Sequence, residues 1–133
     1  MKLDDVGLAR ALAGGVLTLD QVAPPPDMPE RDFTRLAITV ARALGWRVAH
    51  FRSAMMRSGR WATPVQGDGV GWPDLILVRG KRLLAVELKS QFGRLRPEQR
   101  DWLDALGAVP GATCAAIRPA DWAVFCELLE ESS

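Results

Sequence analysis

Two acidic residues, Asp74 and Glu87, lie on either side of a glycine-containing turn at matching distances from it. Residues 75–78 and 83–86 are apolar runs typical of strands, and Gly80-Lys81 between them favours a two-residue type II′ turn. In the resulting hairpin, Asp74 lies opposite Glu87, with Cβ atoms about 4.5–5.5 Å apart. Facing carboxylates repel each other, and a divalent cation between them turns that repulsion into binding. The hairpin therefore predicts a site for an ion such as Mg²⁺, which prefers oxygen ligands.

Lys89 shares a sheet face with Glu87, because side chains alternate between the two faces along a strand. A lysine beside a bound cation can orient a water molecule or stabilise negative charge that grows on a phosphate. The structural alternative is a salt-bridged cluster of Asp74, Glu87 and Lys89 at the rim of the sheet. The pattern alone leaves both interpretations open.

Glu30 is a third acidic candidate, and its position supports two interpretations. Asp27 and Glu30 have the spacing of a capping box, with Asp27 as the N-cap of a helix and Glu30 at position N3. Glu30 also shares a helix face with Phe33 and Ala37, so it points toward the sheet that carries the other two acids. One side chain cannot easily serve both purposes, and the pattern favours neither.

Gln99 lies on the apolar face of another predicted helix, at i, i+3, i+4, i+7 spacing with Trp102, Leu103 and Leu106. An amide on a buried face needs hydrogen-bond partners. Gln99 can bind a strand that carries metal ligands, or the substrate, or it can cap the edge of the core.

An Arg-rich third of the chain is the clearest charge signal. Residues 31–60 hold seven Arg and one Asp, whereas residues 1–30 hold two basic and five acidic side chains. Arg52, Arg57 and Arg60 precede Trp61 in a segment without apolar period. These arginines can contact phosphate and Trp61 can stack on a base. The alternative is an exposed loop without a ligand.

The elements that position these residues follow from hydrophobic periodicity. A helix capped by Asp27 is predicted to end at Gly45, followed by a strand over residues 46–51 and a long loop over residues 53–71. After the hairpin, a helix runs from Pro97 to about residue 106 and a strand covers residues 113–117. A last helix begins at residue 119 or 121 and ends near residue 130.

This order, α-β-β-β-α-β-α, predicts an α/β domain with a mixed central sheet flanked by helices. Pro24-Pro25-Pro26 forms a stiff spacer, because proline fits neither a helix interior nor a central strand. We therefore expect an N-terminal extension over residues 1–26 and one domain over residues 27–133.

Composition excludes several other chemistries. With one His and no Tyr, the chain has neither a two-His zinc helix nor a tyrosine nucleophile. Cys114 and Cys126 do not form a CxxC pair and are expected to be small apolar side chains in a reducing compartment. Both nucleotide-binding glycine loops are missing. The acidic N-terminus differs from a secretory signal and no apolar run reaches the ~18 residues of a membrane span, so a cytoplasmic protein is expected.

The segment Gly71-Trp72-Pro73-Asp74, followed by Glu87-Leu88-Lys89, resembles the active-site motif of PD-(D/E)XK nucleases. More narrowly, the chain is similar to the VRR-NUC family, which comprises small stand-alone, often phage-borne nucleases and the nuclease module of the Fanconi-associated nuclease. The resemblance covers about residues 27–130. It includes further segments in the same order, namely Glu30, Gly45-Trp46, His50, Gly67-Asp68-Gly69, Gly93-Arg94-Leu95, Pro97-Glu98-Gln99 and Arg118-Pro119.

The resemblance implies a restriction-endonuclease-like core that hydrolyses DNA phosphodiester bonds with Mg²⁺ or Mn²⁺. The implied metal ligands are Asp74, Glu87, the backbone carbonyl of Leu88, and Glu30, the last directly or through water. Lys89 would orient the attacking water or stabilise the transition state, and Gln99 would support the site. The implied substrate is branched or structured DNA, including Holliday junctions, and a homodimer would suit a symmetric junction.

Two other functions stay open at this point. The chain could be a nucleic-acid-binding module that keeps the fold without the activity, although the intact Asp74, Glu87 and Lys89 argue against it. It could also be a sequence-specific restriction-type endonuclease, although a chain of 133 residues offers few elements beyond the core with which to read bases.

Overall fold

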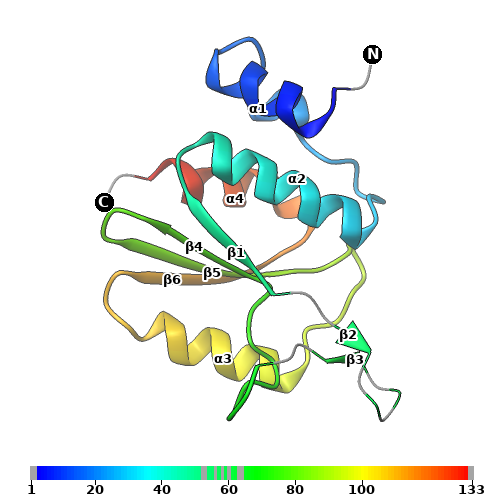
Figure 1. The fold of residues 1–133 in the computed structure, drawn as a ribbon, viewed down its shortest axis with the longest axis vertical. Helices are drawn as coiled ribbons and strands as arrows, with labels where there is room; N and C mark the ends of the chain where they lie inside the picture. The colour runs from blue at the N-terminus through cyan, green and yellow to red at the C-terminus, as the bar shows by residue number, and fades with distance from the viewer. Residues whose placement is uncertain are drawn as a thin grey trace.

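The computed structural model describes residues 3–51, 54, 55, 57, 59, 61, 62 and 65–131 (Figure 1). A four-stranded mixed sheet crosses the middle of the molecule, with helices on both faces. The predicted fold class, an α/β domain with a mixed sheet flanked by helices, is therefore confirmed. Within the described part of the chain, no helix is both long and apolar enough to span a membrane.

The sheet has the strand order β1-β4-β5-β6. β1 (Arg47–His50) pairs antiparallel with β4 (Leu75–Arg79), and β4 pairs antiparallel with β5 (Arg82–Leu88). β5 runs parallel to β6 (Ala112–Ile117), and α3 (Pro97–Gly107) makes the crossover between them. Such a crossover is required because two parallel strands are entered from the same end of the sheet.

The β4–β5 hairpin has the predicted turn and register. Gly80 has φ +60° while Lys81 does not have a positive φ, which is the combination that a type II′ turn requires. Arg79 pairs with Arg82, and the ladder continues to the pair Leu75–Val86. One step further along this register, residue 74 faces residue 87.

α2 (Glu30–Ala43) begins later than the sequence predicts. Its N-cap is Pro29, and no side chain caps its first turn, so the predicted capping box of Asp27 and Glu30 is wrong. The physical reason is that proline disfavours helical backbone at the preceding residue, here Met28, so the helix cannot start before Pro29. Glu30 lies in the first turn and has no capping role.

The C-terminus of α2 has the predicted glycine stop. Gly45 has φ +90°, a conformation that favours glycine. The N–H of Gly45 donates to the carbonyl of Arg42 at 3.1 Å, and the N–H of Trp46 donates to the carbonyl of Ala41 at 3.1 Å. These two bonds form a Schellman motif, which turns the chain directly into β1.

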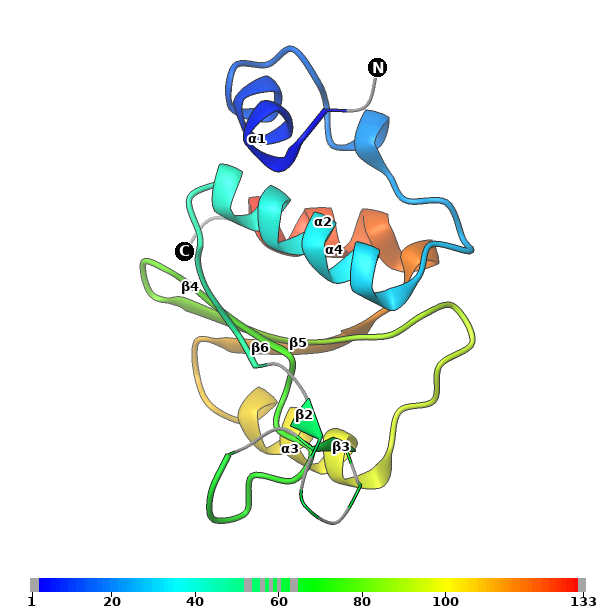
Figure 2. The ribbon, with the colours of Figure 1, turned by 45° about the vertical axis from the view of Figure 1, so that its right-hand side comes forward.

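The helices form two layers around the sheet. α2 and α4 (Trp122–Glu130) cover one face, and α3 covers the other (Figure 2). The short helix η2 (Pro119–Asp121) leads into α4, as expected for the last helix. The main core lies between the sheet, α2 and α4, and its fully buried members include Phe33, Val40, Leu75, Leu77, Leu84, Leu88, Phe125 and Leu129.

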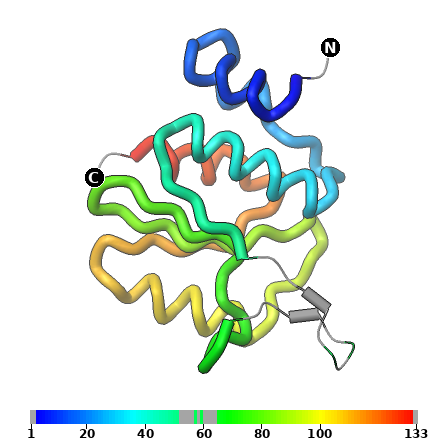
Figure 3. The backbone as a smooth tube through the Cα atoms, viewed as in Figure 1, coloured from blue at the N-terminus to red at the C-terminus, as the bar shows by residue number. Residues whose placement is uncertain are grey.

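The N-terminal segment packs against the domain. α1 (Asp5–Ala13) and η1 (Asp20–Val22) lie on the side of α2 that faces away from the sheet (Figure 3). Leu12, Leu19 and Val22 pack against the core, and the indole N–H of Trp122 donates to the carbonyl of Leu19 at 2.9 Å. The boundary at residue 26 stays a prediction, because a sequence extension can still be part of the packed structure.

Part of the segment expected to be a loop over residues 53–71 is a small ribbon. β2 (Ala54–Met55) pairs antiparallel with β3 (Trp61–Ala62). The expectation of a loop without strands is wrong for these residues. Two-residue strands are too short to produce an alternating pattern, so the sequence carried no periodic signal for them.

Candidate active site

A cavity of about 600 Å³ lies where β1 and β5 end and where α2 begins. The three predicted acids, Glu30, Asp74 and Glu87, line it together with Lys89 and Gln99. Its other lining residues are Arg31, Thr34, His50, Phe51, Arg94 and Arg96. The structure thus brings together acids and bases from α2, the β4–β5 hairpin and the start of α3.

Asp74 is held in place by backbone contacts on both sides. Its carbonyl accepts a hydrogen bond from the N–H of Phe51 at 2.8 Å, which extends the β1–β4 ladder by one step. Its carboxylate Oδ2 accepts a hydrogen bond from the N–H of Leu88 at 3.0 Å. Asp74 therefore bridges β4 and β5 at the end of the hairpin, as the predicted register requires.

Glu87 is the buried acid of the site, with a relative exposure of 2%. Its Oε1 accepts a hydrogen bond from Nε2 of Gln99 at 2.7 Å and lies 3.4 Å from Nζ of Lys89. Its Oε2 is buried and has no hydrogen-bond partner. A buried carboxylate oxygen without a partner is costly for the fold, and either a proton shared with Asp74 or a bound cation removes that cost.

The surroundings of the cavity disfavour the charged form of two of its acids. The pKa of Glu87 is raised to about 8, mainly by burial and next by the charge of Asp74, while Lys89 opposes the shift. At the mouth of the cavity, partial burial raises the pKa of Glu30, with Lys89 lowering it and Asp74 raising it. Perturbed carboxyl pKa values in a shared cavity are typical of functional sites.

The donor set fits a hard divalent cation bound by two carboxylates. Asp74 and Glu87 supply acidic oxygens from adjacent strands, and Oε2 of Glu87 is a buried oxygen in need of a cation. Among the described residues, no group of three or more His, Cys, Asp or Glu side chains is close enough to hold a metal together. Mg²⁺ commonly binds one or two carboxylates, with water and substrate phosphate completing its shell.

The backbone carbonyl of Leu88 is available as a further oxygen ligand. The N–H of Leu88 points to Asp74, whereas the N–H of the next residue, Lys89, donates to the carbonyl of Ile117 on the β6 side at 3.0 Å. Because the N–H and C=O of one strand residue point the same way, the Leu88 carbonyl faces β4. In the hairpin register it faces Pro73, which has no N–H to donate.

Gln99 ties α3 to the site. Its Nε2 donates to Glu87, and its Oε1 accepts a hydrogen bond from the N–H of Arg96 at 2.8 Å. Gln99 is 6% exposed, so both ends of the buried amide are satisfied. Of the three roles that the sequence allowed, the structure supports binding to the strand that carries Glu87.

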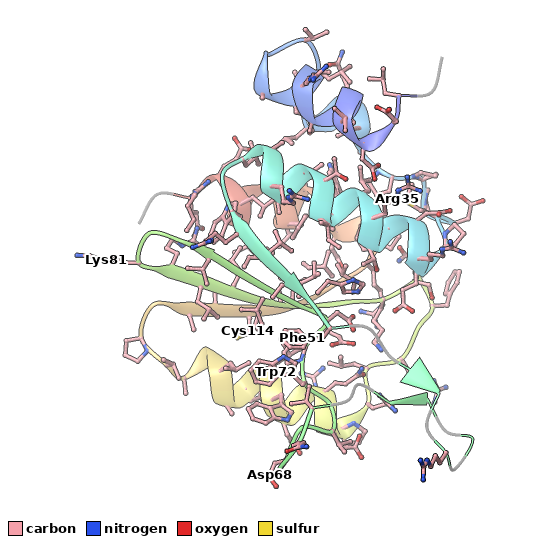
Figure 4. The ribbon with its side chains drawn as sticks, in the orientation of Figure 1. Arg35, Phe51, Asp68, Trp72, Lys81 and Cys114 are labelled. Atoms are coloured by element: carbon pink, nitrogen blue, oxygen red, sulfur yellow. The ribbon has the colours of Figure 1, made fainter. Side chains whose placement is uncertain are left out.

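An aromatic cluster supports the segment that leads into Asp74. The rings of Phe51 and Trp72 are 5.7 Å apart, and those of Trp72 and Trp102 are 4.9 Å apart, both edge to face. Figure 4 shows Phe51 and Trp72 side by side, with Asp68 further out along the same segment. Nε1 of Trp102 donates to the carbonyl of Asp68 at 2.9 Å. These contacts fix the approach of the chain to Asp74.

Of the four residues predicted to contact DNA, Arg57 alone has its side chain in the described part of the structure. Arg52 and Arg60 lie outside the described residues, and so does the side chain of Trp61, although its backbone is part of β3. Arg57 is exposed and does not line the cavity.

Three arginines that do line the cavity, Arg31, Arg94 and Arg96, were not selected from the sequence as site residues. The signal that could have found Arg94 and Arg96 is their position between Lys89 and Gln99, both of which point into the site. Arg31 directly follows Glu30 at the start of α2, so it could have been found from that acid.

The fold and the site together define a class of protein. A mixed sheet that presents Asp74 after Pro73, and Glu87 two residues before Lys89, is consistent with a PD-(D/E)XK-like nuclease fold. In a comparison with protein families, the VRR-NUC domain matches residues 47–115, just over half of the chain. The protein belongs to the VRR-NUC family, whose domains are PD-(D/E)XK-like nucleases.

Membership in this family supports a nuclease-type function with DNA as the implied substrate. The matched segment includes Asp74, Glu87, Lys89 and Gln99, whereas Glu30 lies before it. The comparisons with curated proteins and with solved structures found no significant match.

Proposed function

We propose that this protein is a metal-dependent DNA endonuclease whose active centre is the cavity around Asp74 and Glu87. The proposed metal is Mg²⁺ or Mn²⁺, held by these two carboxylates and the Leu88 carbonyl. Glu30 completes the site through water, because it stands at the cavity mouth and forms no three-acid cluster with the other two. The proposed substrate is branched or structured duplex DNA, which rests on the family resemblance.

One observation carries this proposal, namely that the hairpin buries Glu87 opposite a second acid. Two facing acids weaken a metal-free sheet, because ionisation of buried Glu87 costs hydration and brings repulsion from Asp74. Lys89, at 3.4 Å, offsets part of this cost on Oε1, but Oε2 is left without a partner. A cation placed between the two acids removes both penalties.

The residues around the two acids have separate tasks in hydrolysis. A bound divalent cation supplies charge neutralisation for the phosphate and lowers the pKa of water. Lys89 carries a positive charge beside Glu87, from which it can orient the attacking water and stabilise charge on the phosphate. Gln99 holds the Glu87 carboxylate in one orientation. Arg31, Arg94 and Arg96 are positioned to bind phosphates of the DNA backbone.

The test compares cleavage of supercoiled, linear, single-stranded and four-way-junction DNA, each with EDTA, Mg²⁺ or Mn²⁺. We expect cleavage that needs the metal and that is fastest on the junction. Asp74→Asn and Glu87→Gln should each lower the rate roughly 100-fold or more, because a catalytic cation is worth several kcal/mol. Asp104→Asn, an exposed acid on α3 outside the cavity, is the matched control and should cleave at the parent rate.

Other outcomes identify the alternatives. Cleavage by Glu87→Gln at the parent rate contradicts the proposed centre. Tight DNA binding without cleavage in either metal indicates a binding module that keeps the fold alone. Discrete fragments that share a short sequence indicate a restriction-type enzyme.

A further inference from the structure

Phe92 is the most exposed of the large apolar residues in the described part of the chain, with a relative exposure of 94%. It lies between Lys89 and Arg94, both of which line the active-site cavity. A fully exposed aromatic ring has no role in the core, and its hydration is unfavourable. Its place beside the proposed active centre points to a ligand.

The turn that carries Phe92 lies directly against the site. The N–H of Gly93 donates to the carbonyl of Ser90 at 3.1 Å, which closes a four-residue turn with Phe92 near its tip. A Cβ atom at Gly93 would be 3.5 Å from Cβ and Cδ of Lys89. The turn therefore packs on the stem of Lys89 through Gly93, while the ring of Phe92 projects into solvent outside the cavity lining.

The turn that exposes Phe92 is held by hydrogen bonds on both sides of this residue. On one side, Oε1 of Gln91 accepts a hydrogen bond from the N–H of Ala120 at 3.1 Å. On the other side, Nη2 of Arg118 donates to the carbonyl of Gly93 at 2.7 Å. Both neighbours of Phe92 are thus tied to the start of η2, and the ring is presented on a fixed backbone.

The positive charges that follow Phe92 in the chain indicate which kind of ligand would bind beside it. After the turn, exposed Arg94 and Arg96 alternate with half-buried Leu95. The two arginines therefore lie on the same side of this segment, and both line the cavity. An aromatic ring beside clustered arginines is the combination that binds single-stranded nucleic acid, where bases stack on the ring and phosphates contact the cations. A continuous duplex offers no base face to the ring, because its bases are paired and stacked on one another.

We propose that Phe92 stacks on an unpaired base next to the phosphate bound in the cavity. The protein would thereby recognise DNA with a strand discontinuity, such as a fork, a flap or a junction with an open base. This inference rests on the proposed nuclease function and assigns a residue to its structure selectivity. Phe92 is a specificity-determining contact and takes no part in the hydrolytic step.

The test is a double-mutant cycle on DNA binding, measured by fluorescence anisotropy in EDTA so that metal-dependent cleavage does not occur. The three DNA ligands are a forked duplex with one unpaired base at the fork, the same fork with an abasic site there, and a continuous duplex. The proteins are the parent, Phe92→Ala, Phe92→Trp, and Val124→Ala as an exposed apolar control on α4.

We expect Phe92→Ala to weaken binding of the fork roughly 5- to 150-fold, the fold-change that a stacked base of ~1–3 kcal/mol produces. The abasic fork should bind the parent and Phe92→Ala with equal affinity, and Phe92→Trp should restore the preference for the base. A continuous duplex should bind all variants equally. Melting temperatures should be unchanged, because residue 92 is exposed.

Equal loss on the fork, the abasic fork and the duplex would overturn the proposal, and so would no loss on any of them. A change from dimer to monomer in Phe92→Ala, seen by analytical ultracentrifugation, would assign the ring to a protein interface and also overturn it. Cleavage by the parent protein in Mg²⁺ or Mn²⁺ is measured in parallel. If the parent cleaves DNA but Phe92→Ala weakens binding of the fork no more than binding of the abasic fork, only the role of Phe92 is rejected. If the loss depends on the unpaired base but the parent does not cleave DNA, only the nuclease function is rejected.

Discussion

Glu87, a residue of the proposed active centre, lowers the stability of the fold. It is buried, its ionisation is opposed by the charge of Asp74, and its Oε2 has no hydrogen-bond partner. A residue selected for stability alone would be apolar at this position, like Ala85 and Val86 before it on β5. The arrangement supports the proposed cation site.

The raised pKa of Glu87 predicts how the stability of the metal-free protein depends on pH. The folded protein holds a proton on Glu87 up to about pH 8, whereas the unfolded chain releases it near the usual value of 4.5. Since the folded state then binds more protons, its stability falls as the pH rises between these two values. Melting temperatures in EDTA from pH 5 to pH 9 should therefore decrease for the parent protein.

Glu87→Gln is the matched variant for this measurement, because its amide keeps the shape and can still accept the bond from Gln99. We expect a flatter profile for the variant and a higher melting temperature than the parent at pH 9. Addition of Mg²⁺ or Mn²⁺ should stabilise the parent at pH 9 and leave the variant nearly unchanged. Parallel profiles for the two proteins in EDTA would show that Glu87 does not titrate in this range.

The hairpin and the helix that follows it show why part of the site could be predicted from the sequence. Gly80 fixes a two-residue turn, and a two-residue turn fixes the register, so the facing of residues 74 and 87 follows from local chemistry. Helical spacing likewise placed Gln99 on the buried face of α3.

The parts that could not be predicted depend on backbone limits or on contacts between distant segments. The start of α2 was misplaced because the effect of Pro29 on Met28 outweighs the capping preference of Asp27. The aromatic cluster of Phe51, Trp72 and Trp102 joins residues far apart in the chain, which periodicity within one element cannot reveal.

The link between α3 and β5 gives a prediction at the scale of elements. Gln99→Leu removes the donor to Oε1 of Glu87 and the acceptor for the N–H of Arg96. A carboxylate that loses a donor is less well oriented and holds its proton more strongly. We expect cleavage to fall about 10- to 100-fold, as is typical when a group that orients a metal ligand is removed.

A pH–rate profile separates this positioning role from a general loss of stability. In Gln99→Leu, the acidic limb of the profile should move to higher pH, and the affinity for Mn²⁺ measured by calorimetry should fall. Gln66→Leu, at an exposed position outside the cavity, is the control and should behave like the parent. An unchanged profile with only a lower melting temperature would limit Gln99 to capping α3.

At the scale of the whole molecule, the candidate site and the N-terminal segment occupy different parts of the surface of α2. The described residues that line the cavity begin at Glu30, at the N-terminus of this helix. α1 and η1 instead cover its outer side and the region around Trp122 (Figure 1). The N-terminal segment therefore contributes to the packed structure without reaching the site.

This division predicts that removal of residues 1–23 destabilises the protein without abolishing its activity. The truncation removes Leu12, Leu19 and Val22 from their partly buried positions and exposes Trp122. Full burial of one such side chain contributes ~1.5–3 kcal/mol, so three partly buried ones should contribute about 2–4 kcal/mol. We expect urea unfolding at a lower midpoint and with a smaller m value, since less surface is exposed on unfolding.

Below the transition, the truncated protein should cleave DNA within about twofold of the full chain's rate. Asp5→Ala breaks the exposed ion pair with Arg35 and should leave the unfolding midpoint nearly unchanged. Equal midpoints for truncated and full chains would show that residues 1–23 are an appendage, and lost cleavage in a folded truncated protein would place part of the active centre before Glu30.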